Sequence, residues 1–102
     1  MELSTWHMWW KRSGAAQLRS ILMDEWDPIG IHGVPEAADE YDSYLGQLGA
    51  RLREGGGVDE ISKYLTDIEE VHMGLGQSEA ARTRNRALAQ RLVDWQAMET
   101  QA

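Results

Sequence analysis

The side chains best suited to chemistry in this sequence are carboxylates between residues 24 and 42. Glu36, Asp39 and Glu40 include spacings of three and four residues, which place two carboxylates on one face of a helix. Asp24 and Asp27 precede them along the chain and add further oxygen ligands. Such a set could hold a hard cation such as Mg²⁺. The simpler interpretation is a solvated acidic face, because acids near a helix N-terminus interact favourably with the helix dipole.

A magnesium-dependent hydrolase of a small phosphorylated substrate is the enzymatic interpretation of these carboxylates. All-helical nucleotide pyrophosphatases hold Mg²⁺ between paired acidic helices, but this sequence lacks their repeated E-x-x-E and E-x-x-D arrangement. It also has no Lys or Arg in residues 24–50 to hold a phosphate. We therefore predict no metal site and no cofactor, and we keep the hydrolase as an alternative.

The remaining polar residues form no recognisable catalytic set. His7, His32 and His72 are too far apart for the compact spacing of a metal site. His72 falls on an apolar helix face, where we expect a hydrogen-bonded core or boundary histidine. The chain has no cysteine and no nucleophile motif, and the glycines 55–57 lack the Lys and Ser or Thr of a phosphate-binding loop. We predict that the protein is not an enzyme.

The charge is concentrated in the middle of the chain. The formal net charge is −7, and residues 24–70 hold thirteen acidic residues against three basic ones. This distribution argues against direct nucleic-acid binding, which needs a basic surface. It favours a partner with a basic surface, a divalent metal or simply solubility.

Apolar spacing predicts four helices and no strand, so we expect an all-α bundle in a single domain, residues 1–102. The predicted helices cover 15–26, 36–54, 58–75 and 79–98, with 5–12 either extending the first helix or forming its own turn. Ser13 and Ser78 are the expected N-caps, and Gly14 favours a bend. Glycines at 55–57 and at 74 and 76 are expected to end the second and third helices.

The first two helices are joined by a Pro- and Gly-rich connection, residues 26–35. Because Asp27 precedes Pro28, we expect it to have an extended backbone. Ile29, Ile31 and Val34 are branched aliphatics, and we expect them to pack onto the core. The connection is therefore predicted to be ordered.

Five tryptophans are present, and three of them, Trp6, Trp9 and Trp10, lie in the Trp-rich start of the chain, residues 1–12. We expect them to cover one end of the core. The alternative is an interaction surface, because Trp and Tyr dominate interface energetics. Membrane-surface attachment is a weaker interpretation, since the only basic patch nearby is short (Lys11, Arg12 and Arg19).

The expected location is the cytoplasm. The absence of cysteine fits a reducing compartment. The N-terminal ten residues lack the apolar core and cleavage site of a signal peptide, and no apolar run is long enough to span a bilayer.

Several short motifs together resemble a family of small uncharacterised bacterial proteins, the YugE-like domains. They are W-D-P-I-G at 26–30, D-E-Y-D-x-Y at 39–44, the helix around 61–65 and M-G-L at 73–75. The match covers about residues 15–76, and the Arg-rich last helix, 78–98, falls outside it. The resemblance implies a compact all-α fold but no established activity, cofactor or catalytic residue. It also suggests that the first two motifs form one packed unit, with Tyr41 and Tyr44 holding the loop.

These observations predict a small non-enzymatic binding module that uses an acidic face against a basic protein partner. The most concrete version is an immunity protein or inhibitor that neutralises a toxin or nuclease. A structural homo-oligomer built through the Trp-rich start and the last helix is a further alternative. Tyr41 or Trp26 is the predicted aromatic anchor. The other predicted contact residues are six acids: Asp24, Asp27, Glu36, Asp39, Glu40 and Asp42.

Overall fold

The computed structural model describes residues 2–30, 33–34 and 40–100, and in these ranges the chain forms four helical segments and no strand. This confirms the predicted all-α bundle of about four helices. None of the described helices combines the length and the apolar composition needed to cross a bilayer. The first segment is one helix made of α1 (Leu3–Trp9), η1 (Trp10–Gly14), α2 (Ala15–Ile21) and η2 (Leu22–Trp26). The second is α3 (Asp42–Arg53). The third consists of α4 (Val58–Asp67) and η4 (Ile68–His72), and the fourth is α5 (Glu79–Thr100).

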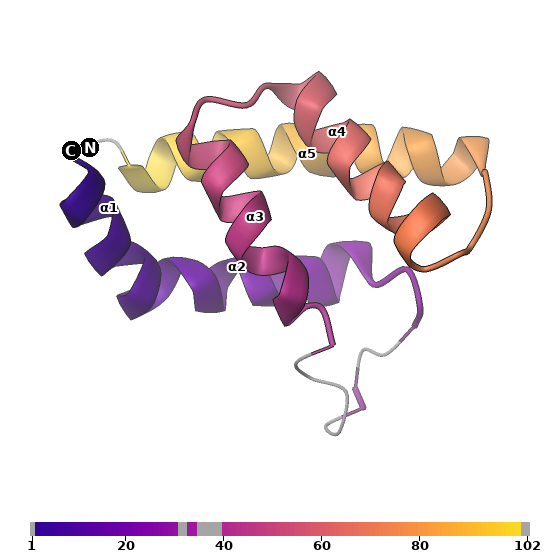
Figure 1. Ribbon diagram of the computed structural model, residues 1–102, viewed down its shortest axis with the longest axis horizontal. Coiled ribbons are helices and arrows are strands. Elements are labelled where there is room, and N and C mark those ends of the chain that lie inside the picture. Colours follow the sequence, from indigo (N-terminus) through magenta and orange to yellow (C-terminus); the bar gives the residue numbers. More distant parts are fainter. Residues whose placement is uncertain (1, 31–32, 35–39, 101–102) are drawn as a thin grey trace.

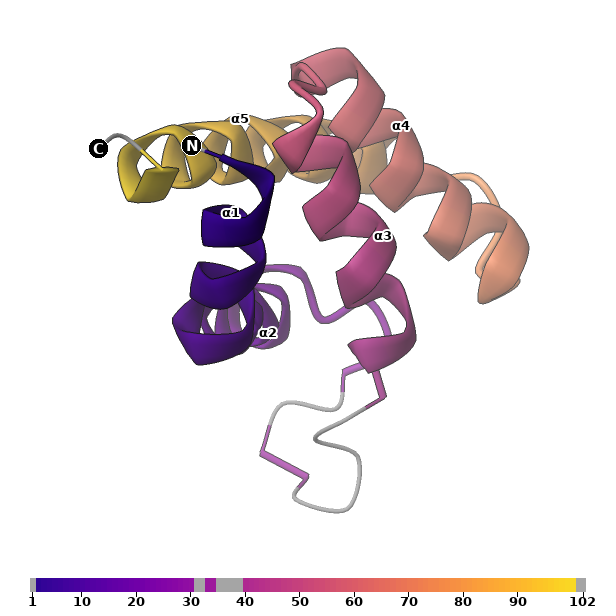
Figure 2. The same cartoon turned by 60° about the vertical axis from the view of Figure 1, so that its left-hand side comes forward.

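The bundle is organised around the long last helix. α5 extends along one side of the molecule, α4 packs on it, and α3 bridges α2 and α4 (Figures 1 and 2). Burial of one apolar stripe from each helix forms the common core. Its most completely buried aliphatic side chains are Leu18, Leu22, Leu48, Ile61, Leu65, Ile68 and Leu92.

The first helix is continuous across the predicted start at Ser13, so the expected N-cap there is wrong. Residues 10–14 form a wider, π-type turn, and α1 and α2 run in different directions on either side of it (Figure 1). The ring of Trp9 lies against Gly14, where an added Cβ would be 2.8 Å from the ring. The expected bend therefore lies at this π-type turn, where an indole packs on a residue with no side chain.

The Trp-rich start covers one end of the core, as predicted. Trp6 and Trp9 are buried, the rings of Trp6 and Trp10 stack at 5.2 Å, and those of Trp9 and Trp95 lie 5.6 Å apart. The guanidinium of Arg53 lies 5.0 Å from the centre of a Trp6 ring. These contacts join the first helix to α3 and α5, so most of this aromatic area is core.

Local signals predicted the end of α3 and the start of α5 correctly, but the predicted start of the second helix near Glu36 is wrong, because Glu40 and Tyr41 form a turn and α3 begins at Asp42. Gly55 is left-handed (φ 84°), and the Gly56 N–H donates to the Arg51 carbonyl at 2.9 Å, which closes α3. The Ala81 N–H donates to the Ser78 hydroxyl at 3.2 Å, which caps α5 as expected.

The predicted apolar face of the third helix is confirmed at Ile61, Leu65 and Ile68 but is wrong at His72 and Leu75, which are exposed. The cause is the wider turn of η4, closed by the Met73 N–H donating to the Ile68 carbonyl at 2.8 Å. A wider turn rotates the following residues by less than an α-helix does. His72 and Leu75 therefore leave the face directed at the core, whereas Glu69 continues the spacing of Ile61 and Leu65 and is buried there.

The packing of Trp10 on α3 generates a stability prediction. A Cβ added at Gly49 would lie 2.6 Å from the Trp10 ring, whereas one added at Gly46 in the same helix has nothing within 4 Å. We expect G49A to lower the free energy of unfolding by about 1–3 kcal/mol through overpacking. G46A should raise it by roughly 0.5–1 kcal/mol, because alanine is the better helix former. Urea unfolding of both variants measures this, and equal effects at the two sites would contradict the Trp10 contact.

Candidate functional site

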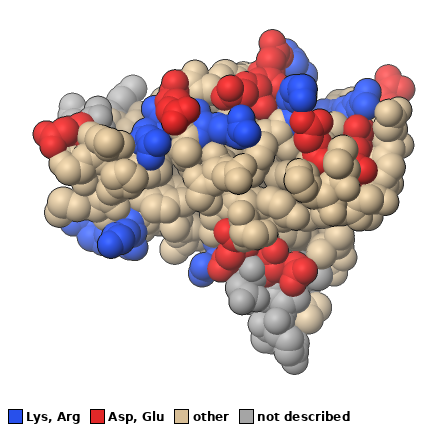
Figure 3. All heavy atoms as spheres, in the orientation of Figure 1, with Lys and Arg blue, Asp and Glu red and all other residues tan. Residues whose placement is uncertain are grey.

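The predicted contact residues lie between the end of η2 and the start of α3, a segment we call the acidic bend (residues 24–42). Five of its carboxylates belong to the described residues: Asp24, Glu25, Asp27, Glu40 and Asp42. Glu36, Asp39 and His32 lie outside them. No Lys or Arg occurs in the bend. In Figure 3, acidic side chains gather where this connection leaves the helices.

Two arginines of the bundle pair with the acidic bend. Arg19 donates to both carboxylate oxygens of Asp42 at 2.8 and 2.7 Å, and Arg91 lies 3.6 Å from Glu25. Both pairs are largely exposed, so each contributes only about 0–1 kcal/mol, and their carboxylates stay accessible from water. Of the arginines in the last helix, only Arg91 reaches the described part of the bend.

The predicted aromatic anchors are not on the surface. Trp26 is 3% exposed and Tyr41 is 1% exposed, and their rings lie 5.3 Å apart in the core. An anchor that inserts into a partner must be accessible in the free protein. The prediction that Trp26 or Tyr41 inserts into a partner is therefore wrong, and both residues fix the base of the bend instead.

Tyr41 connects the two ends of the bend. Its hydroxyl donates to Asp27 Oδ1 at 2.8 Å and accepts from the Ile29 N–H at 3.3 Å. Burial, followed by the Asp27 hydrogen bond, raises the pKa of Tyr41 well above its usual value, although the Ile29 bond acts the other way. The predicted packing of the W-D-P-I-G and D-E-Y-D motifs against each other is confirmed by these contacts.

Asp27 has a left-handed backbone (φ 39°, ψ 56°), so the expected extended conformation is wrong. It ends η2, with its N–H donating to the Leu22 carbonyl at 2.9 Å. Aspartate tolerates this region better than most residues, and the Tyr41 bond holds its carboxylate in place. The chain consequently turns sharply out of the helix at this residue.

The apolar side chains of the connection do not all pack inward. Ile29 is 41% exposed and Val34 is 44% exposed, so their predicted packing on the core is wrong; Ile31 lies outside the described residues. Gly30 and Gly33 have positive φ angles of 68° and 84°, a conformation that glycine adopts without steric cost. In Figures 1 and 2 the described parts of the connection lie beyond the ends of α2 and α3.

A buried carboxylate that sequence reasoning missed supports this arrangement. Glu69 is 5% exposed and accepts from Trp26 Nε1 at 3.0 Å, from Arg84 at 2.5 Å and from the Asn85 side-chain amide. Asn85, itself fully buried, also donates to the Thr66 hydroxyl at 3.2 Å. A signal was available, because Glu69 follows Ile61 and Leu65 at the same four-residue spacing.

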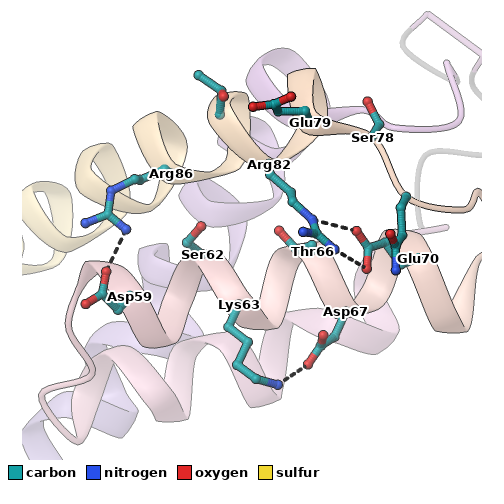
Figure 4. A pocket seen from close by; sticks show the side chains of 12 residues that line it. Asp59, Ser62, Lys63, Thr66, Asp67, Glu70, Ser78, Glu79, Arg82 and Arg86 are labelled. Carbon is teal, nitrogen blue, oxygen red and sulfur yellow. Dashed lines mark hydrogen bonds and ion pairs between the residues drawn. The ribbon is translucent and has the colours of Figure 1, made fainter.

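An open polar hollow of about 820 Å³ lies between α4 and α5 (Figure 4). Ion pairs line it: Arg82 with Glu70 at 2.9 Å, and Arg86 with Asp59 at 2.6 Å. On its α4 side Lys63 pairs with Asp67 at 2.8 Å. These groups satisfy one another and form no nucleophile–base arrangement. Within the described ranges, moreover, no three His, Asp or Glu side chains gather closely enough to hold a metal.

The Tyr41 bridge makes a prediction about stability and pH. At pH 7, Y41F should lower the free energy of unfolding by about 1–2 kcal/mol, because the hydroxyl bonds to a carboxylate. The raised pKa means that the folded state holds the phenolic proton more tightly. This stabilisation is complete below the unfolded pKa of about 10 and is lost as the pH rises above it. Urea unfolding from pH 7 to pH 11 should show a weaker alkaline decline in Y41F. Y44F is the control and should change stability by less than about 0.5 kcal/mol at pH 7.

The Glu69 network makes a second prediction. E69Q should lower the free energy of unfolding by about 2–4 kcal/mol, because Arg84 loses its charged acceptor and the new amide cannot satisfy every donor. E70Q removes the neighbouring pair with Arg82, which is partly exposed, and should cost no more than about 1 kcal/mol. Chemical unfolding of the two variants gives the comparison. An equal loss of unfolding free energy in E69Q and E70Q would contradict the prediction that the buried Glu69 network stabilises the fold more than the exposed Arg82–Glu70 pair.

Comparison of the chain with known proteins identifies no relative. No family model matches the chain, and neither a curated protein nor a solved structure matches it. The resemblance to the YugE-like family therefore stays a prediction.

Proposed function

We propose that this protein is a small non-enzymatic binding module whose acidic bend docks on a basic surface of another protein. The most concrete form of the proposal is an immunity protein or inhibitor that neutralises a toxin or nuclease, in the cytoplasm. The observation that supports it most is the composition of the bend. Its described residues bring together five carboxylates, no basic residue and the exposed side chains of Ile29 and Val34.

The proposed contact residues have different tasks. The acids Asp24, Asp27, Glu36, Asp39, Glu40 and Asp42 would attract the basic partner and set its orientation, because charge complementarity mainly raises the association rate and specificity. Ile29 and Val34 take the place of the aromatic anchors as the apolar contacts. Trp26 and Tyr41 act indirectly, since they hold the base of the bend and limit the conformational entropy lost on binding.

Nothing among the described residues favours the hydrolase alternative, because their acids are dispersed or paired with arginines. We therefore put forward binding alone.

Charge reversal in the bend tests the proposal. We expect D39K/E40K to reduce capture of the native partner from a lysate by at least about tenfold, because two attractive charges become repulsive. The measurement is affinity capture with immobilised protein at about 50 and 300 mM salt, followed by identification of the retained proteins. The loss should be larger at low salt.

The matched control is E54K/E99K, which makes the same change in net charge at two exposed residues outside the bend. It should retain normal capture. Unchanged capture by D39K/E40K, with the fold intact by circular dichroism, would end the proposal.

A further inference from the structure

An arginine from outside the acidic bend already occupies one carboxylate of the bend. Arg19 lies in α2, and its Nε and Nη2 atoms donate to the two carboxylate oxygens of Asp42 at 2.8 and 2.7 Å. This two-bond fork is the geometry in which a guanidinium binds a carboxylate most strongly. A second guanidinium cannot form the same fork on Asp42 while Arg19 is in place.

The Arg19–Asp42 pair lies where an incoming side chain can replace it. The two side chains are 47% and 32% exposed, so the pair is in contact with water and contributes little to stability. Asp42 also lies in the first turn of α3, where the helix dipole stabilises a negative charge whether or not Arg19 is present. An external guanidinium can therefore take the place of Arg19 without disturbing the bundle.

The other arginine pairs of the described residues differ from this one in place or in geometry. Arg82 forms a comparable fork with Glu70, but between α4 and α5, outside the bend. Arg91 approaches Glu25 in the bend, but at 3.6 Å, which is longer than a hydrogen bond. Arg19 is thus the arginine that combines a fork with a position on the proposed binding surface.

We propose that Arg19 holds the place of an arginine of the basic partner, and that the partner displaces Arg19 from Asp42 when it binds. The inference rests on the proposed function, because it concerns the same acidic bend, and it identifies arginine as the partner side chain at Asp42. The internal pair makes the bend selective. A lysine cannot form the fork, so it gains less at Asp42 than the arginine that it would have to displace.

Removal of Arg19 tests the displacement. R19Q should bind a nona-arginine peptide about three- to tenfold more tightly than the natural protein, because Asp42 is vacant and a nearby positive charge is gone. The gain for nona-lysine should be less than half as large, since an ammonium makes no fork. Fluorescence anisotropy of the labelled peptides in about 50 mM salt measures both affinities, and circular dichroism checks the fold.

The matched control is R86Q, which makes the same change in net charge. Its carboxylate partner is Asp59 in the first turn of α4, outside the bend. R86Q should bind both peptides within about twofold of the natural protein. An R19Q variant that binds nona-arginine no more tightly than R86Q overturns the proposal. Equal gains for the two peptides also overturn it, because charge alone would then explain the effect.

D39K/E40K in the same assay separates this inference from the proposed function. We expect this variant to lose most of its nona-arginine binding, because the bend becomes repulsive. If it binds as tightly as the natural protein, the bend is not the binding surface and both proposals fail. If D39K/E40K loses binding while R19Q gains none, the bend still binds basic partners and only the displacement of Arg19 is wrong.

Discussion

The buried carboxylate of Glu69 joins three of the four helical segments. A carboxylate removed from water is strongly destabilising unless several donors surround it. Here the donors come from different places: Trp26 at the end of the first helix, and Arg84 and Asn85 on α5. Because all must meet at one group, the end of the first helix is held at a defined position against α4 and α5. The geometry of the acidic bend follows from that position.

Tyr41 links Trp26, whose position is fixed by Glu69, to the residues of the acidic bend. Its ring packs against Trp26, and its hydroxyl holds Asp27 and Ile29 on the other side of the connection. The base of the bend is thus fixed in the core, while Ile29 and Val34 remain in contact with water. A surface whose base is held in place loses less conformational freedom on binding than a free loop.

The arginines of α5 explain why charge becomes concentrated in particular places. Arg82, Arg84 and Arg86 pair with acids of the third helical segment, so much of the acidic middle of the chain is balanced internally. Basic side chains remain exposed at the bend of the first helix, where Lys11 and Arg12 lie in η1, and acidic side chains gather where this helix leads into the acidic bend. The proposed docking on a basic partner uses the acidic bend.

The sequence alone determined the helices and several of their limits, because apolar periodicity, the Gly55 turn and the Ser78 cap act over a few residues. The tertiary structure decided which side chains form the site. Trp26 and Tyr41 are buried, while Ile29 is exposed, because their environment depends on segments far away in sequence. Glu69, and not His72, faces inward at the end of the third helical segment, where Trp26 and the α5 residues Arg84 and Asn85 supply its donors.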